Sequence, residues 1–242
     1  MKAMILAAGR GERMRPLTDK TPKPLLPVGG KPLIVWQIER LVAAGIRDIV
    51  INHAHLGEQL VAALGDGRAW GANILWSPEA EALETAGGIF KALPLLGRSP
   101  FLVVSADIYC ECDYRALIEA SPLDKNAQAL LWMTDNPVWH PAGDFALRDA
   151  CLHLTGEPRL TYANFGLFRP EMLADAPELS PGKKLPLRPL LDRLIPAGKI
   201  QGAKLEGLWD NLGTPEQLAR LDTRLRAATP GLPGQKTGES GR

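Results

Sequence analysis

The alternation of short apolar runs with helical patterns over residues 2–133 constrains the fold of this chain most. Five mainly apolar runs are predicted strands: 2–7, 48–52, 73–76, 101–105 and 127–133. Four segments between them carry apolar residues at helical spacing: 33–44, 57–64, 85–93 and 114–120. Apolar strands that alternate with helices form sheets that are covered on both faces. The sequence therefore predicts an α/β fold with a three-layer, Rossmann-like, mostly parallel sheet and helices on both faces.

The pattern changes after about residue 137. Short segments separated by turn signals predict antiparallel hairpins beside the main sheet, which would form a small antiparallel subdomain: 144–148, 151–155 and 159–169. Two helices and a strand are predicted beyond them: 187–195, 214–227 and 200–205. Thr214 is a suitable N-cap for the last helix. We expect a single domain over residues 1–228 and a disordered Gly- and Pro-rich tail over 229–242.

Composition limits the classes of partner. The formal net charge of the 242 residues is +1, so an anion site must be local, and nucleic acid is not an expected partner. No apolar stretch approaches the roughly 20 residues that cross a bilayer, and residues 3–8 are too short for a signal peptide. We expect a soluble, cytoplasmic protein with no membrane partner. Cys110 and Cys112 stand too close for an ordinary disulfide, so we expect free thiols.

A long loop after the first strand suggests a phosphate site. Gly9 and Gly11 can bring backbone N–H groups close to phosphate oxygens, and Arg10, Arg13 and Lys23 add cations. Arginine suits a pyrophosphate and lysine a single phosphate. Prolines between these residues stiffen the loop. A solvated basic loop would have the same composition, so composition alone leaves both interpretations open.

The exact string favours the phosphate site. "LAAGRGERMRPLT" at residues 6–18 and "PKPLLPVGGKPLI" at 22–34 resemble the signature of the sugar-phosphate nucleotidyltransferases. Members of that family join a nucleoside triphosphate to a sugar 1-phosphate and release pyrophosphate. "SPEAEALETAGGI" at 77–89 is similar to the family's base-binding segment. The resemblance implies that residues 1–135 mainly bind the nucleotide, 136–206 the sugar phosphate, and 207–228 contribute to a metal site.

Specific roles follow from that resemblance. It implies a nucleotide site formed by Ala8, Gly9, Gly11, Glu12, Arg13, Lys23, Glu79, Thr85, Ala86 and Gly87. Arg13 and Lys23 would be catalytic, with Arg13 on the β- and γ-phosphates and Lys23 on the phosphate under attack. Glu79 could equally belong to a solvated acidic loop. The attacking phosphate has a second pKa of about 6, so the reaction needs alignment and charge neutralisation rather than a general base.

The resemblance also implies bound Mg²⁺. "FLVVSAD" ends on Asp107 where the family has a metal ligand, although Ala106 replaces the usual glycine. "LWDNLGTPEQL" at 208–218 resembles the family's Trp-x-Asp-x-Gly-Thr-Pro motif, and we take Asp210 as its carboxylate. Two aspartates that each follow an apolar strand suit a hard cation that also binds phosphate oxygens.

Within the family, the chain is most similar to the short members that convert UTP and N-acetylmuramate 1-phosphate to UDP-N-acetylmuramate in peptidoglycan recycling. This likeness makes Asp144, Glu157 and Asn164 candidates for the sugar-phosphate site, although the first two could be turn residues. Mannose-1-phosphate guanylyl transfer and glucose-1-phosphate uridylyl or thymidylyl transfer remain alternatives, and a non-catalytic nucleotide-sugar sensor is a remote one. The expected partners are UTP and a sugar 1-phosphate, bound by a monomer or a small homo-oligomer.

Overall fold

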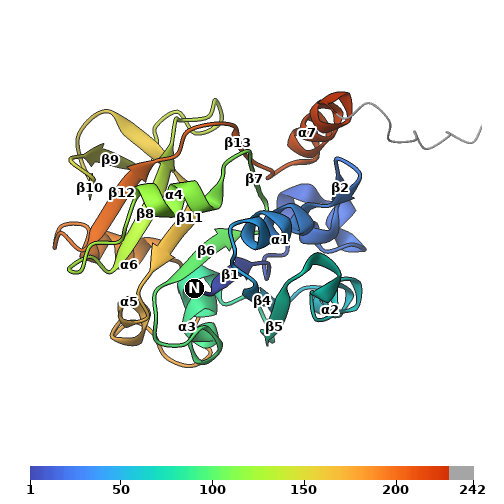
Figure 1. The fold of residues 1–242 in the computed structure, drawn as a ribbon, viewed down its shortest axis with the longest axis horizontal. Helices are drawn as coiled ribbons and strands as arrows, with labels where there is room; N and C mark the ends of the chain where they lie inside the picture. Colours follow the sequence, from blue (N-terminus) through green and yellow to red (C-terminus); the bar gives the residue numbers. More distant parts are fainter. Residues whose placement is uncertain (229–242) are drawn as a thin grey trace, which may run out of the picture.

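A computed structural model describes residues 1–228, and the predicted tail over 229–242 lies outside the described residues. Figure 1 shows one broad sheet with helices on both of its sides. The sheet has nine strands in the order β5-β4-β1-β6-β11-β8-β12-β10-β9. These strands are β1 (Ala3–Leu6), β4 (Asp48–His53), β5 (Asn73–Pro78), β6 (Phe101–Ser105), β8 (Ala129–Thr134), β9 (Phe145–Arg148), β10 (Cys151–His153), β11 (Arg159–Phe168) and β12 (Ile200–Lys204).

Two groups of helices cover the two faces of the sheet. Seven α-helices are found in residues 1–228: α1 (Leu33–Ala43), α2 (Gly57–Leu64), α3 (Glu84–Leu96), α4 (Tyr114–Ala120), α5 (Glu171–Ala174), α6 (Arg188–Leu194) and α7 (Pro215–Ala228). Side chains of α1, α2 and α4 share one apolar core with the sheet, and side chains of α3, α5 and α6 share a second core on the other face. The predicted three-layer α/β fold is therefore confirmed.

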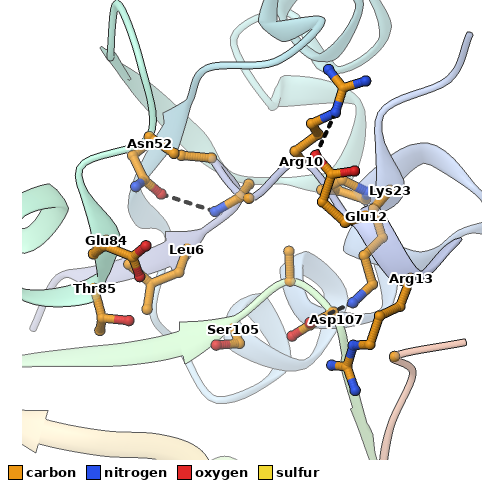
Figure 2. A pocket seen from close by; sticks show the side chains of 18 residues that line it. Leu6, Arg10, Glu12, Arg13, Lys23, Asn52, Glu84, Thr85, Ser105 and Asp107 are labelled. Carbon is orange, nitrogen blue, oxygen red and sulfur yellow. Dashed lines mark hydrogen bonds and ion pairs between the residues drawn. The ribbon is translucent and has the colours of Figure 1, made fainter. Parts of the chain in front are cut away.

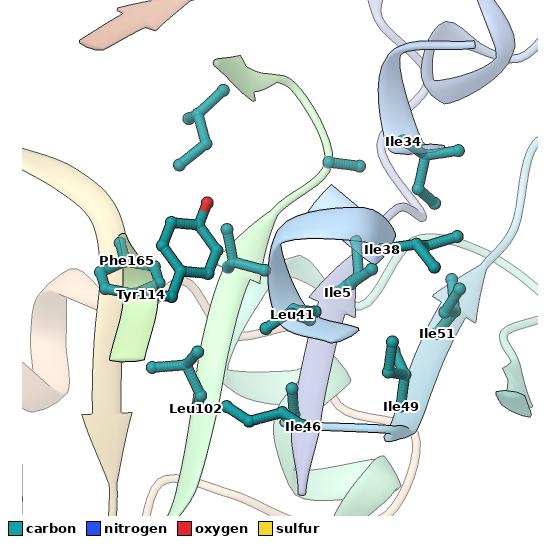
Figure 3. Packing of buried hydrophobic residues seen from close by; sticks show 14 of the residues in the cluster. Ile5, Ile34, Ile38, Leu41, Ile46, Ile49, Ile51, Leu102, Tyr114 and Phe165 are labelled. Carbon is teal, nitrogen blue, oxygen red and sulfur yellow. The ribbon is translucent and has the colours of Figure 1, made fainter. Parts of the chain in front are cut away.

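The first core shows how the apolar periodicity of α1 is used. Ile34, Ile38 and Leu41 are fully buried, and Figure 3 shows them in the same cluster as Ile5 of β1 and Ile51 of β4. Their spacing of three and four residues places them on one face of the helix. Burying such side chains stabilises the fold by about 1.5–3 kcal/mol each. This packing holds β1 and β4 in place, and the opening loop begins at the carboxyl end of β1.

The parallel part of the sheet comprises β5, β4, β1 and β6, as the apolar runs predict. The second half of the chain does not form the separate sheet beside this one that the sequence predicts. Instead, β11 runs antiparallel between β6 and β8, and β9 and β10 extend the far edge. β8 and β12 form a further parallel pair. The hairpins are antiparallel as predicted, but pairing with β6 makes them part of one continuous sheet.

Two small two-stranded ribbons were not predicted. One pairs β2 (Pro27–Val28) with β3 (Lys31–Pro32), and the other pairs β7 (Ile108–Cys110) with β13 (Trp209–Asn211). α7 follows β13 and packs in a third apolar cluster against the opening loop. Thr214 caps α7 as predicted, because its Oγ1 accepts a hydrogen bond from Gln217 N at 3.4 Å.

The prediction of free thiols at Cys110 and Cys112 is wrong. The structure joins them in a disulfide, with a Cα–Cα distance of 5.4 Å. That distance lies within the range that a disulfide spans, although only one residue separates the two cysteines. Cys151 remains free and exposed. Within residues 1–228, every helix is too short or too polar to cross a membrane.

Candidate active site

A cleft of about 500 Å³ opens at the carboxyl ends of β1 and β6 (Figure 2). This is the edge of a parallel sheet where α/β proteins bind ligands. Its lining comes from the loop after β1, the end of β4, the start of α3, the end of β6 and the segment after β13. The lining residues are Leu6, Ala7, Ala8, Gly9, Arg10, Gly11, Glu12, Arg13, Lys23, Pro24, Asn52, Ala82, Glu84, Thr85, Ser105, Ala106, Asp107 and Gly213.

The glycine-rich turn is shaped by close contacts. Gly11 has a φ of +70°, and a Cβ atom there would lie 3.1 Å from the Thr18 side chain and 3.2 Å from Lys23 Cβ. Thr18 Oγ1 donates a hydrogen bond to the Gly11 carbonyl at 2.9 Å. Gly9 is exposed, and a Cβ there would meet no atom within 4 Å. The turn therefore needs glycine at position 11, and it leaves Gly9 open to a ligand.

Cations gather at one side of the cleft. The Lys23 side chain is 10% exposed, and its Nζ lies 2.5 Å from Asp107 Oδ2. Arg13 is exposed and its guanidinium adjoins Gly213, where a Cβ would lie 2.9 Å from Nη2. Glu12 also lines the cleft, but its carboxylate pairs with Arg10 at 2.7 Å. The structure thus brings the predicted residues Arg13, Lys23 and Asp107 together.

Three predicted nucleotide residues do not line this cleft. Glu79 is 6% exposed; its Oε1 accepts from Asn52 Nδ2 at 2.7 Å and its Oε2 from Leu83 N at 2.8 Å. Burial raises the pKa of the Glu79 carboxyl above its ordinary value, although both hydrogen bonds and Lys91 oppose that shift. The N–H groups of Ala86 and Gly87 both donate to the Leu185 carbonyl. Hydrogen bonds within the protein therefore occupy these groups.

Two side chains of the cleft were missed in the sequence. Asn52 is buried at the end of β4, and its Oδ1 accepts from Ala7 N at 2.9 Å. The sequence signal that could have identified Asn52 is a polar residue at the end of an apolar strand. Glu84 begins α3 with a φ of 63°, a region that non-glycine residues rarely adopt. A glutamate in a first helical turn is ordinary, so this strained backbone could not be predicted from the residue type.

The cleft is therefore polarised. Figure 2 shows Arg13 and Lys23 on one side, and Asn52, Glu84 and Thr85 on the other. Cations and open backbone suit a chain of phosphates, whereas amide, hydroxyl and carboxylate groups suit the donors and acceptors of a base. This arrangement can hold an extended nucleotide along the end of the sheet.

A second cavity of about 380 Å³ adjoins the cleft and shares Leu6, Thr85 and Ser105 with it. The rest of its lining is Trp139, His140, Asp144, Phe145, Thr161, Tyr162, Asn164, Pro186, Leu187, Arg188, Leu191, Trp209 and Asn211. Aromatic rings next to a few polar groups are typical of a small-molecule site. The cavity brings together two of the three predicted sugar residues, Asp144 and Asn164.

Asn164 is held in an irregular strand. The register of β11 against β8 shifts between Tyr162 and Gly166, and Asn164 has a φ of 54°. A bulge of this kind redirects a side chain and is common beside active sites. Asp144 is less free, because its Oδ2 accepts from Tyr162 N at 2.8 Å and its Oδ1 lies 3.2 Å from His140 Nε2.

The third predicted sugar residue, Glu157, lines neither cavity. It is exposed, and its Oε2 accepts a hydrogen bond from Arg159 N at 3.1 Å. Its carbonyl accepts a hydrogen bond from Arg148 Nη2 at 3.3 Å. These local contacts match the turn interpretation.

Asp210 is likewise absent from both linings. Its Oδ2 pairs with Arg220 Nη2 of α7 at 2.9 Å. Trp209 and Asn211, its neighbours in β13, line the second cavity. Side chains alternate along a strand, so Asp210 lies on the opposite side from these two. Counting two places from Trp209 also gives Asn211 at the position of the motif's aspartate. The expectation that Asp210 faces the site is therefore wrong, and Asn211 is the candidate metal ligand in its place.

Asp107 and Asn211 offer oxygen atoms that fit a divalent cation. Asn211 Oδ1 is buried without a hydrogen-bond partner in residues 1–228. The next residue, Leu212, donates its N–H to the Asp107 carbonyl at 2.9 Å, which places β13 beside Asp107. An unpaired amide oxygen near a carboxylate suits a hard cation. The described part of the chain has no cluster of three or more His, Cys, Asp or Glu side chains for a metal. Substrate phosphates and water would therefore complete the coordination.

Comparison with known proteins gives relatives over nearly the whole chain. Residues 2–141 match the protein family described as Nucleotidyl transferase. The N-acetylmuramate alpha-1-phosphate uridylyltransferase of Neisseria meningitidis is 51% identical over 88% of this chain and 94% of that relative. The Caulobacter vibrioides protein of the same name is 36% identical over 93% and 97%. A mannose-1-phosphate guanyltransferase of Aspergillus fumigatus is 32% identical over 89% of this chain, which spans 62% of that relative.

Solved structures share the fold. A Bacillus anthracis protein assigned as a glucose-1-phosphate thymidylyltransferase, in complex with sucrose, superposes with a TM-score of 0.82 at 24% identity. That alignment covers 96% of this chain and 98% of the other. HddC from Yersinia pseudotuberculosis, complexed with GMP-PN, superposes with a TM-score of 0.74 at 20% identity, covering 92% and 98%. These likenesses support the α/β architecture described above.

Proposed function

The chain belongs to the nucleotidyl transferase family, and on that premise we propose that it converts UTP and N-acetylmuramate 1-phosphate to UDP-N-acetylmuramate and pyrophosphate. The observation that carries this proposal is the 51% identity to the Neisseria meningitidis relative over 94% of its length. The polarised cleft and the adjoining aromatic cavity offer one site for a nucleotide and one for a sugar.

The proposed reaction forms one bond and breaks another at the same phosphorus. A phosphate oxygen of the sugar 1-phosphate attacks the α-phosphorus of UTP, and the bond from that phosphorus to the β-phosphate oxygen breaks. Pyrophosphate leaves with its electron pair. The attacking phosphate is largely ionised at neutral pH, so the chain needs no residue to remove a proton. Alignment and charge neutralisation are the remaining demands.

Lys23 and Arg13 meet the demand for positive charge. The buried stem of Lys23 fixes its ammonium group in the cleft, where it would neutralise charge on the phosphate under attack. Arg13 is more exposed and would bind the leaving pyrophosphate through its planar guanidinium. The open backbone at Gly9 and Gly11 would donate N–H groups to the same phosphates.

Asp107 and Asn211 would hold Mg²⁺ between the two cavities. When bound, the cation would neutralise phosphate charge as a Lewis acid. Asp107 is paired with Lys23 at 2.5 Å, so both side chains would exchange this contact for new partners when substrate binds. Asn211 contributes a neutral oxygen, which gives the pair of ligands one formal negative charge rather than two.

Pyrophosphate release tests the proposal. UTP, GTP and dTTP are each combined with N-acetylmuramate, N-acetylglucosamine, mannose and glucose 1-phosphates, with Mg²⁺ present. UTP with N-acetylmuramate 1-phosphate should give the highest kcat/KM. Preference for GTP with mannose 1-phosphate would instead assign the activity printed for the Aspergillus fumigatus relative. If no pair of substrates released pyrophosphate, the result would favour a binding protein over an enzyme.

The proposed product suggests a cellular setting. UDP-N-acetylmuramate is a precursor of peptidoglycan, so the reaction would return a recovered cell-wall sugar to synthesis. UTP is a cytoplasmic nucleotide, and we therefore place the reaction in the cytoplasm.

A further inference from the structure

Arg188 contributes a positively charged side chain to the lining of the second cavity. Among the described residues lining the second cavity, it is the one arginine or lysine. The aspartate of that lining, Asp144, uses both of its oxygens on Tyr162 N and His140. The carboxylate of this lining is therefore occupied by contacts within the protein, which leaves Arg188 as the residue of the cavity that can bind an anionic group.

The guanidinium of Arg188 is oriented by two contacts. Its central carbon lies 4.9 Å from the ring centre of Phe145, a buried residue of the cavity wall. Its Nε donates to Asp192 Oδ1 at 2.6 Å. Within residues 1–228, the structure gives its two terminal nitrogens no hydrogen bond, and the side chain is 52% exposed. Two parallel donors therefore remain for a ligand.

Helix stability does not account for an arginine at this position. Arg188 begins α6, and a cation in a first turn is opposed by the helix dipole. In its pair with Asp192 the basic residue comes first, which is the weaker order for an i,i+4 pair. An exposed pair of this kind contributes little to stability.

The location of Arg188 separates it from the reacting phosphates. The nucleotide cleft and the second cavity meet at Leu6, Thr85 and Ser105, whereas Arg188 and Phe145 line the second cavity alone. In the proposed reaction, phosphate transfer takes place beside Asp107 and Lys23, which line the nucleotide cleft and not the second cavity. A ligand anion at Arg188 is therefore a second anion, carried by the sugar itself.

The sugar of the proposed function carries such an anion. N-acetylmuramate 1-phosphate differs from N-acetylglucosamine 1-phosphate by a lactyl ether with a carboxylate. Resting on the proposed function, we propose that Arg188 binds this carboxylate with its terminal nitrogens and thereby selects muramate over glucosamine. A planar guanidinium matches the two oxygens of a carboxylate. The lactyl carboxylate needs a partner of this kind once it leaves water.

The test compares two substrates that differ only in the lactyl group. Arg188→Gln should lower kcat/KM for N-acetylmuramate 1-phosphate by about 100-fold, in line with loss of a charge-assisted contact. Its kcat/KM for N-acetylglucosamine 1-phosphate should stay within about threefold of the wild-type value. Arg188→Lys, which keeps the charge but not the planar fork, should fall between the two. If N-acetylglucosamine 1-phosphate turns over too slowly, its inhibition constant replaces kcat/KM.

Arg193→Gln is the matched control. Arg193 lies on the same helix and pairs with Glu178 at 3.0 Å, away from both linings. It should leave both substrates unaffected. An equal loss on both substrates in Arg188→Gln would overturn the proposal, since it would place Arg188 on the phosphate or ring that both share. No loss on either would overturn it as well.

Equilibrium binding separates this inference from the proposed reaction. Calorimetric titration with each sugar 1-phosphate needs no turnover. Tighter binding of N-acetylmuramate 1-phosphate that disappears in Arg188→Gln would support the carboxylate site even if no pyrophosphate were released. Equal binding of both sugars by the wild type would overturn it even if uridylyl transfer were confirmed.

Discussion

Lys23 combines a buried stem with a charged tip. A Cβ atom at Gly11 would lie 3.2 Å from the Cβ and 3.3 Å from the Cδ of Lys23, so the stem has little room, and the ammonium pairs with Asp107. We expect Lys23→Met, which keeps an apolar stem, to lower kcat by about 10²–10³-fold while the UTP dissociation constant changes much less. The reason is that negative charge accumulates on the α-phosphate in the transition state. Steady-state kinetics gives kcat, and an equilibrium titration of the same variant with UTP gives the dissociation constant.

Lys20→Met serves as the control for that variant, because Lys20 is exposed in the same loop and lines neither cavity. It should behave like the wild type. A Lys23→Met protein with weak UTP binding and normal kcat would show that Lys23 binds the ground state and the transition state equally.

Asn211 and Asp210 are neighbours, but we expect only substitutions at Asn211 to change the affinity for Mg²⁺. Asn211→Asp should bind Mg²⁺ more tightly, because a second carboxylate adds charge to an oxygen site, and Asn211→Leu should bind it more weakly. Asp210→Asn should leave the Mg²⁺ affinity unchanged, since that carboxylate pairs with Arg220. Titration with Mn²⁺ followed by electron paramagnetic resonance measures the affinity directly, alongside the Mg²⁺ concentration for half-maximal activity. Loss of Mn²⁺ binding in Asp210→Asn would return the metal site to the sequence-based interpretation.

At the scale of elements, Glu79 ties the ends of β4 and β5 to the start of α3. A carboxyl whose pKa is raised in the folded state binds more protons folded than unfolded, so its stabilising effect is lost as pH rises. The free energy of unfolding of the wild type, relative to Glu79→Gln, should therefore decrease as pH rises from the ordinary value near 4.5 through the raised pKa. Urea unfolding of both proteins at several pH values measures this difference.

Glu81→Gln is the control for the loss of a surface carboxylate, because the Glu81 side chain is 67% exposed and pairs only with Lys184 among described residues. Its unfolding free energy should stay within about 0.5 kcal/mol of the wild type. A wild-type advantage over Glu79→Gln that grows with pH would contradict the assigned burial effect.

The bulge in β11 is a second element that can be tested. Asn164→Gly suits the positive φ and should preserve stability within about 0.5 kcal/mol, while it removes an amide from the second cavity. We expect KM for the sugar 1-phosphate to rise about tenfold while KM for UTP changes little. Asn164→Val should lose stability as well, because a β-branched residue is strained at this φ. A Gly variant with normal sugar KM would make the bulge purely structural.

Local patterns predicted the elements well and side-chain directions less well. Apolar runs and helical spacing depend on burial of one face, so α1 and α2 have nearly the predicted ends. The direction of Asp210 depends on the three-residue ribbon of β7 and β13, whose partners lie about a hundred residues apart. The family resemblance assigns Glu79 to the base site, because nothing in the local sequence reveals that Asn52 and Leu83 occupy both of its oxygens.

At the scale of the whole molecule, the order of strands was the part that sequence could not supply. β11 pairs with β6, and this pairing inserts the second half of the chain into the sheet of the first. The strands that pair with β11 are determined by packing between distant parts of the chain. The apolar pattern of β11 does not predict which strands these are. As a result, the nucleotide cleft and the second cavity share walls formed by β1 and β6.

This continuous sheet predicts that residues 1–228 unfold as one unit. Segment 1–135 would expose the edge of β6 without β11, so the two halves stabilise each other. We expect one calorimetric transition whose calorimetric and van't Hoff enthalpies agree. UTP with Mg²⁺ at about 100 times its dissociation constant should raise the Tm of the whole transition by about 5–10 °C, because binding to the folded state alone contributes about 2.7 kcal/mol. Two transitions, only one of them shifted by the nucleotide, would show instead that the sugar-binding half folds independently.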